Sequence, residues 1–309
     1  MALIIEKKHI KDFVKQLRQK FIVIDSTKKN GILPEAKKHV FPPKQEIFKF
    51  YAEKGYADNP IEKKKFVIFG LNPADLRAIV FLDKIMKTPE PDFFYFQKRK
   101  KTIIIGLSDY SLDSMIGGDI IFEKINPKQY QVLFLSNKGR KLSKNKFFKK
   151  IKNPKIKKYL YRKTPLDKML LDPELLSDAV DWSRNHKIWE ELEKKCLGCG
   201  NCSYVCPLCY CFSMEDKISL DDKECVRCRL WDSCTLPEFA EVAGGHDFHK
   251  GVKERYYNWF YHKFVRGYKE YGRSLCVACN RCQKYCPAEI DIEKILLKIV
   301  KDYKHEKSL

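Results

Sequence analysis

The chain has 309 residues, of which 61 are Lys or Arg and 40 are Asp or Glu, so its formal net charge is +21 at pH 7. This length allows two domains, and no apolar run approaches the roughly 20 residues that span a bilayer. The chain carries 13 cysteines and we expect no signal peptide, which favours a cytoplasmic protein over a secreted disulfide scaffold.

The first 165 residues contain no cysteine and predict an α/β domain without metal. Short β-branched and aromatic runs ended by turn residues predict buried strands at 21–25, 65–70, 102–106 and 131–135. Apolar residues at helical spacing predict helices over 9–20 and 74–86. We expect this domain, 1–165, to end in the polar, basic stretch 142–163.

The second half has a different pattern. Helices are predicted over 166–180, 184–195, 252–268 and 292–303. Asp291 is the expected N-cap of the last of them. The cysteines are interspersed among these helices, so residues 166–309 are predicted to form a mainly α-helical ferredoxin domain. The predicted fold class is therefore α+β.

Two cysteine runs of identical spacing carry the strongest signal. Each has the form C-x2-C-x2-C-x3-C-P, which is the ligand pattern of a protein with two [4Fe-4S] clusters. The runs consist of Cys196, Cys199, Cys202 and Cys206, and of Cys276, Cys279, Cys282 and Cys286. The alternatives are zinc knuckles, which usually have two CxxC pairs or added histidines, and a disulfide framework.

The fourth cysteine of each run can serve either cluster. In two-cluster ferredoxins it ligates the cluster of the other run. This crossed assignment gives one cluster Cys196, Cys199, Cys202 and Cys286, and the other Cys276, Cys279, Cys282 and Cys206. A straight assignment within each run is the alternative.

Five further cysteines lie between the runs and could bind a third metal, either a [4Fe-4S] cluster or zinc. They are Cys209, Cys211, Cys225, Cys228 and Cys234. CxC and CxxC pairs can chelate one metal from two turns. In the alternative interpretation they are reduced cysteines that pack in the interior of a cytosolic protein.

The order of these motifs resembles the beta (iron-sulfur) subunit of cytoplasmic [NiFe] hydrogenases, or sulfhydrogenases, and its relative in anaerobic sulfite reductase. The resemblance rests on the segments Cys206–Phe212, Arg229–Cys234, Arg255–Phe264, Cys276–Ile292, Phe41–Phe48 and Phe69–Ile79. The chain resembles a divergent member in two places. Ala74 replaces the cysteine of the family's Pro-Cys-Asp motif, and no cysteine lies in 106–113, where the family has further cysteines. In relatives those cysteines serve an extra cluster.

The resemblance implies an electron-transfer subunit that relays electrons between a flavin subunit using NAD(P)H, or a ferredoxin, and a catalytic subunit. The chain has no Rossmann glycine motif, P-loop or nucleophile-base constellation, so we expect no catalysis by the chain alone. The basic charge suits an acidic partner, such as an acidic ferredoxin, or a lysine-rich soluble surface. The N-terminal domain is expected to be a docking domain.

Three alternative functions remain open. The first is an electron-transfer subunit of a sulfite, sulfur or heterodisulfide reductase. The second is a protein with purely structural clusters in an assembly complex. The third is a nucleic-acid complex with structural clusters, which would need aromatic residues such as Tyr256 and Trp259 exposed for base stacking. Their helical spacing favours a core instead, so nucleic acid is not the expected partner.

Overall fold

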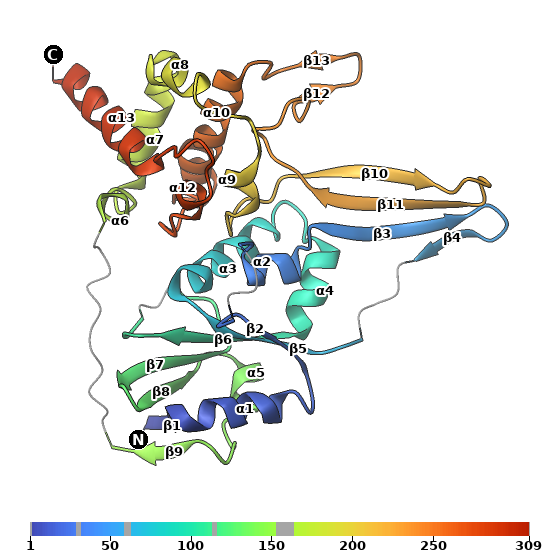
Figure 1. Cartoon of the computed structure of the whole chain (residues 1–309), viewed down its shortest axis with the longest axis vertical. Coiled ribbons are helices and arrows are strands. Elements are labelled where there is room, and N and C mark those ends of the chain that lie inside the picture. Colours follow the sequence, from blue (N-terminus) through green and yellow to red (C-terminus); the bar gives the residue numbers. More distant parts are fainter. Residues whose placement is uncertain (1, 29–31, 59–62, 113–115, 153–163, 309) are drawn as a thin grey trace. The chain divides into compact units, whose positions relative to one another are not determined.

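The computed structural model describes residues 2–28, 32–58, 63–112, 116–152 and 164–308. The chain divides into two compact units, Met1–Pro42 with Asn59–Leu160, and Pro43–Asp58 with Tyr161–Leu309 (Figure 1). This division differs from the predicted one at residue 165, since residues 43–58 belong to the second unit. Part of the basic stretch expected to end the first domain, 153–163, lies outside the described residues.

A seven-stranded sheet forms the centre of the first unit, in the order β2-β5-β6-β7-β8-β1-β9. Its strands are β1 (Ala2–Glu6), β2 (Ile22–Asp25), β5 (Phe66–Leu71), β6 (Thr102–Ser108), β7 (Ile120–Asn126), β8 (Gln129–Phe134) and β9 (Lys149–Ile151). Strands β2, β5, β6 and β7 run parallel, whereas β8, β1 and β9 pair antiparallel with their neighbours. The four strands predicted in this half are confirmed.

Among the described residues of this unit, six helical segments accompany the sheet. They are η1 (Lys7–His9), α1 (Ile10–Leu17), α2 (Glu35–Val40), α3 (Pro73–Ile85), α4 (Phe93–Lys101) and α5 (Asn137–Arg140). Helix α3 begins where Asn72 accepts a hydrogen bond from the amide of Asp75 at 3.0 Å, and Pro73 occupies its first turn. Phe13 of α1 is fully buried against the sheet residues Ile5 and Phe122.

Gly139 packs directly on the backbone of residue 119. A Cβ atom built at this glycine would overlap the Asp119 carbonyl group. Asp119 is itself held, because its carboxylate accepts from the amide of Ile104 at 2.8 Å and from the hydroxyl of Ser136. Backbone atoms cannot move away as a flexible side chain would, so this contact admits only glycine.

We expect Gly139→Ala to lower the free energy of unfolding by about 1–3 kcal/mol through overpacking. Thermal unfolding of the purified full chain measures the effect. Arg140→Ala is the matched control, because Arg140 is exposed on the same helical turn and exposed substitutions usually stay within about 0.5 kcal/mol. Equal melting temperatures for the two variants would contradict the prediction.

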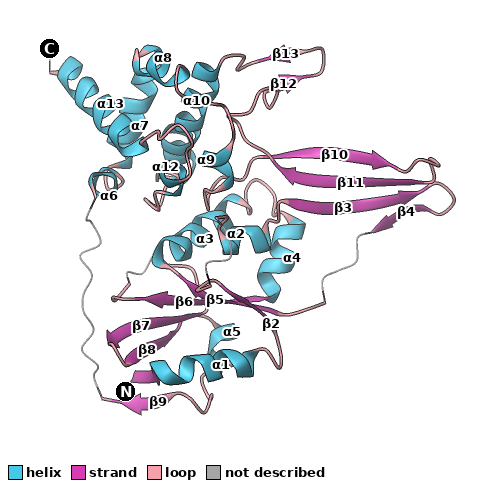
Figure 2. Cartoon of the chain, viewed as in Figure 1, coloured by secondary structure: helices cyan, strands magenta, loops and turns pink. Residues whose placement is uncertain are grey.

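The second unit contains a four-stranded antiparallel sheet in the order β10-β11-β3-β4 (Figure 2). Its strands are β3 (Lys44–Tyr51), β4 (Gly55–Asp58), β10 (Phe212–Ile218) and β11 (Glu224–Trp231). A further hairpin pairs β12 (Glu241–Val242) with β13 (His246–Asp247). The α+β class is confirmed, but a mainly helical second domain is not, because this unit combines helices with sheet.

Most helices of this unit follow the predicted ranges with breaks, whereas the two short helices inside the cysteine runs were not predicted. They are α6 (Pro165–Met169), α7 (Pro173–Trp182), η2 (Ser183–Asn185), α8 (Ile188–Glu193), α9 (Asn201–Tyr204), α10 (Val252–Phe260), η3 (Tyr261–Arg266), α11 (Gly267–Tyr271), α12 (Arg281–Lys284) and α13 (Ile292–Lys307). The single helix predicted over 166–180 is two helices, since Asp172 caps a new one that starts at Pro173. Asp291 caps α13 as predicted.

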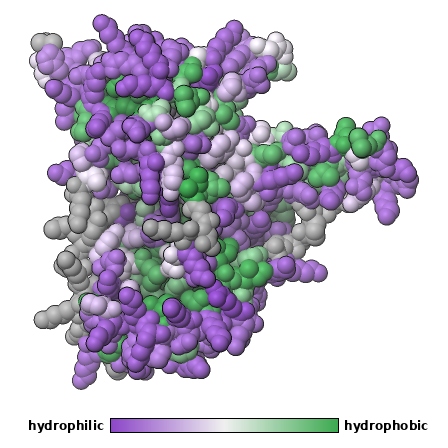
Figure 3. All heavy atoms as spheres, in the orientation of Figure 1, coloured by the Kyte–Doolittle hydropathy of each residue, from purple (hydrophilic) through white to green (hydrophobic). Residues whose placement is uncertain are grey.

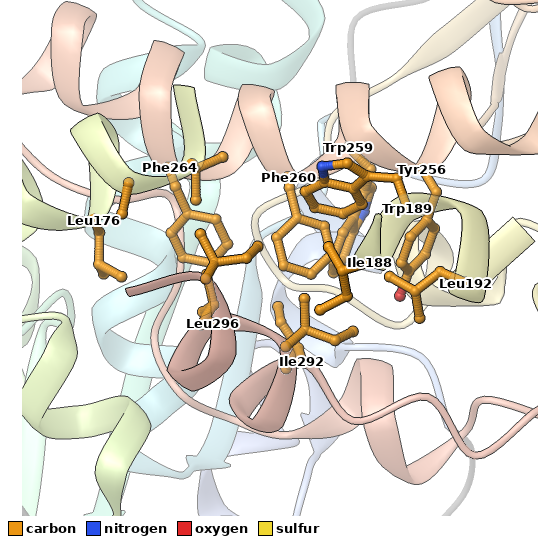
Figure 4. Packing of buried hydrophobic residues seen from close by; sticks show 14 of the residues in the cluster. Leu176, Ile188, Trp189, Leu192, Tyr256, Trp259, Phe260, Phe264, Ile292 and Leu296 are labelled. Atoms are coloured by element: carbon orange, nitrogen blue, oxygen red, sulfur yellow. The ribbon is translucent and has the colours of Figure 1, made fainter. Parts of the chain in front are cut away.

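An aromatic core joins these helices (Figure 4). Phe260 is fully buried, and its ring centroid lies 5.0 Å from that of Trp189 and 5.3 Å from that of Trp259. Leu296 and Ile292 of α13 belong to the same cluster. Several cysteines of both runs pack against this cluster, so the core and the thiols share one interior. Within the described segments, no helix combines the length and apolar character needed to cross a membrane.

Candidate metal centre

The two cysteine runs adopt the same backbone conformation. Gly198 and Ala278, two residues after the first cysteine of each run, have φ values of 59° and 50°. Gly200 and Asn280, which precede the short helices α9 and α12, have φ values of 76° and 54°. A left-handed conformation is strained for residues other than glycine and persists where the surroundings require it. Both runs therefore present their thiols from the same kind of loop.

Backbone amides in these loops point at sulfur atoms. The amide of Gly198 donates to Cys196 Sγ at 3.5 Å, and that of Leu208 donates to Cys206 Sγ at 3.4 Å. Burial raises the pKa of Cys276 to about 12, and a backbone hydrogen bond from Ala278 counteracts part of this rise. Such donors stabilise the thiolate, which is the form that binds metal.

The fourth cysteine of each run lies near the leading cysteines of the other. Burial raises the pKa of Cys196, and the neighbouring charge of Cys286 raises it further. Burial also raises the pKa of Cys282 well above its usual value, with added contributions from Cys276 and Cys206. The structure thus brings cysteines of both runs into one interior of the second unit.

These thiols suit a group that brings its own positive charge. Burial raises the pKa of Cys202 to about 12, so its thiolate needs a cation nearby. In the described part of the chain, no group of three or more Cys, His, Asp or Glu side chains converges closely enough to hold a single metal ion. The donor set, two runs of four cysteines with C-x2-C-x2-C-x3-C-P spacing, fits [4Fe-4S] clusters better than zinc.

Three of the five remaining cysteines lie together beside the first run. A hydrogen bond with Cys206, together with burial, raises the pKa of Cys209 well above its usual value. A hydrogen bond with Cys211, together with burial, does the same for Cys234. Cys209, Cys211 and Cys234 line a cavity of about 10 Å³, which is about the space of one water molecule.

The other two cysteines, Cys225 and Cys228, lie in a strand of the four-stranded sheet. Both lie in β11, where Cys225 pairs with Phe50 of β3 and Cys228 with Glu46. Side chains alternate between the two faces of a strand, so residues three apart point in opposite directions. The structure therefore does not present these two thiols as a chelating pair. A third site with four ligands among the five cysteines stays a prediction from their spacing.

Lys263 is a charged residue at the site that the sequence pattern did not reveal. Its side chain is buried, and Nζ lies 3.2 Å from Cys206 Sγ. Burial alone would lower the pKa of Lys263, but the neighbouring thiolates, led by that of Cys206, raise it well above its usual value. The available signal was a lysine placed between Trp259 and Phe264 on the apolar face of a predicted helix.

Two comparisons with known proteins agree with this geometry. Residues 195–290 match the model of a family described as a 4Fe-4S dicluster domain. The chain is similar to sulfhydrogenase 2 subunit beta of Pyrococcus furiosus, with 31% identity over 280 residues, which cover 86% of this chain and 82% of that protein. No solved structure gives a significant match.

Proposed function

The chain belongs to the family of sulfhydrogenase beta subunits and is an iron-sulfur electron-transfer subunit of a hydrogenase-like oxidoreductase, and from this we propose how its cysteines are used. The eight cysteines of the two runs hold two [4Fe-4S] clusters in the crossed arrangement. Cys196, Cys199, Cys202 and Cys286 hold one, and Cys276, Cys279, Cys282 and Cys206 hold the other. When bound, such clusters supply one-electron transfer.

The observation that carries this proposal is that Cys286 lies within electrostatic range of Cys196, and Cys206 within electrostatic range of Cys276 and Cys282. The amides of Gly198 and Leu208 donate to ligand sulfur atoms. Cysteines of both runs pack against the shared aromatic core, whereas Cys199 is exposed. These features support two sites that share one interior.

The proposed partners are a flavin-containing reductase subunit, a catalytic redox subunit and, in solution, an acidic ferredoxin. Hydrophilic side chains cover most of the face seen in Figure 3, and the net charge of +21 would accelerate the docking of acidic partners. Residues 1–165 are proposed as a metal-free docking domain. Binding of nucleic acid by stacking is disfavoured, because Tyr256 and Trp259 are buried at 6% and 2% exposure.

Anaerobically purified chain should contain about eight irons and eight acid-labile sulfides from the two runs, or about twelve with a third cubane. Dithionite should bleach the visible absorption, and an oxidised viologen should restore it. Iron and sulfide analysis combined with this titration tests the proposal. Stoichiometric zinc without iron would refute it, and clusters that cannot be reduced reversibly in the intact complex would favour a structural role.

We further propose that Cys209, Cys211 and Cys234 contribute ligands to a third metal site, a cluster rather than a single ion. Replacing all three by serine should lower the metal content by one site, because all three line one small cavity. Cys225→Ser combined with Cys228→Ser is the matched control and should leave the metal content unchanged, since the two thiols face opposite sides of β11. Metal analysis that shows no difference between these variants would identify packing cysteines.

A further inference from the structure

One helical turn near the thiols departs from regular geometry. Segment η3 (Tyr261–Arg266) is a π-helix inside the long helix that begins with α10. Its consecutive residues Lys263, Phe264 and Val265 are all buried, at 5%, 0% and 0% exposure. Successive side chains of a regular helix point in directions about 100° apart, so an unbroken surface helix would expose one of them. π-Helical turns are rare in proteins, and those that occur are often located at functional sites.

The ammonium group of Lys263 is held in place by its surroundings. Nζ lies 3.2 Å from Cys206 Sγ, 3.4 Å from the carbonyl oxygen of Leu275, and 4.9 Å from the ring centroid of Trp259. The Lys263 carbonyl also accepts from the amide of Leu275 at 2.7 Å. The adjoining cavity of about 10 Å³ has room for at most about one water.

A buried ammonium is costly unless an anion compensates it. The Cys206 thiol is in direct contact with Lys263, and Cys209 lines the same small cavity as the lysine. Cys276 and Cys282 lie within electrostatic range of its ammonium group. Three of these four thiols, Cys206, Cys276 and Cys282, belong to one proposed cluster, so the charge of this lysine acts mainly on that cluster. A cation so close to a cluster, in an interior of low dielectric constant, favours the state with one more electron.

We propose that Lys263 is a positioning residue whose fixed positive charge raises the reduction potential of the cluster held by Cys206, Cys276, Cys279 and Cys282. This role rests on the proposed function. Its consequence is an asymmetric pair, in which an electron entering the subunit resides on the cluster beside Lys263 before it moves on. The lysine would thus set the direction of the relay without touching a substrate.

Redox titration of the full-length, cluster-loaded chain, followed by electron paramagnetic resonance, tests this role. In Lys263→Met, one midpoint potential should fall by at least about 59 mV, which is a tenfold change in the ratio of reduced to oxidised cluster for a one-electron couple. The midpoint potential of the other cluster should remain that of the wild-type chain. Lys263→Arg keeps the charge and should retain both midpoints. Lys284→Met is the matched control, because Lys284 is an exposed lysine inside the second cysteine run.

Each possible result either supports or overturns the proposed role of Lys263. Unchanged midpoints in a fully loaded Lys263→Met variant, or equal shifts in Lys263→Met and Lys263→Arg, would overturn the role. If Lys263→Met loses iron and Lys263→Arg retains it, the charge is needed to hold the cluster, which supports the same role. Loss of iron in both would indicate packing and overturn it. A wild-type chain without iron would instead refute the proposed function and this role with it.

Discussion

The double variant Cys206→Ser, Cys282→Ser should retain about four of roughly eight irons, the same number as each single variant. In the crossed arrangement both residues hold one cluster, so the second substitution removes nothing more. The reciprocal variant Cys206→Ser, Cys202→Ser should lose nearly all iron, because its two cysteines belong to different clusters. Iron analysis after anaerobic purification measures both outcomes. A straight arrangement would exchange the two results.

The single variants should also lose stability, since metal binding contributes to folding when the site forms only in the folded chain. Cys286→Ser should melt at a lower temperature than Cys225→Ser, whose thiol lies in β11 outside both runs. Near-ultraviolet circular dichroism under argon reports this difference. Full iron content in Cys286→Ser would contradict the ligand role.

Phe260→Ala should destabilise the second unit by about 3–5 kcal/mol, the usual cost of removing a fully buried aromatic side chain. Phe260 is 0% exposed and packs against Trp189, Trp259 and Phe264. Guanidinium unfolding of the cluster-loaded chain should show an earlier midpoint, together with earlier loss of the visible absorption.

The matched control is Phe248→Ala, since Phe248 is 64% exposed and exposed substitutions usually stay within about 0.5 kcal/mol. The comparison separates the removal of a phenyl ring from the removal of a core contact. Similar midpoints for both variants would show that the aromatic cluster does not limit the stability of this unit.

The parts of the fold that could be predicted are those where one segment carries its own pattern. Strands β5 and β6 are short apolar runs, and the helix that starts at Val252 shows apolar residues at helical spacing. Strands β3 and β10 gave no such signal. Every residue of β10 is exposed, and β3 pairs with a strand from the far half of the chain. Such strands depend on their partners rather than on local preference.

The same contrast applies to the site. Thiol spacing identified the candidate ligands, because the C-x2-C-x2-C-x3-C-P pattern is itself a local geometry. The spacing of Cys225 and Cys228 was misleading, since it suggests chelation in a loop but separates the two thiols in a strand. No pattern in the sequence assigned a separate role to Lys263, because its contact with Cys206 depends on the tertiary structure.

The discontinuity of the second unit has a consequence for biosynthesis. Strand β3 leaves the ribosome early, but its partner β11 follows about 170 residues later, on the order of 10–35 s at 5–20 residues per second. During this interval β3 has an unpaired edge that could associate with another nascent chain. Its charged residues Lys44, Glu46 and Lys49 oppose such pairing. The strand therefore carries its own protection for the time before its partner is made.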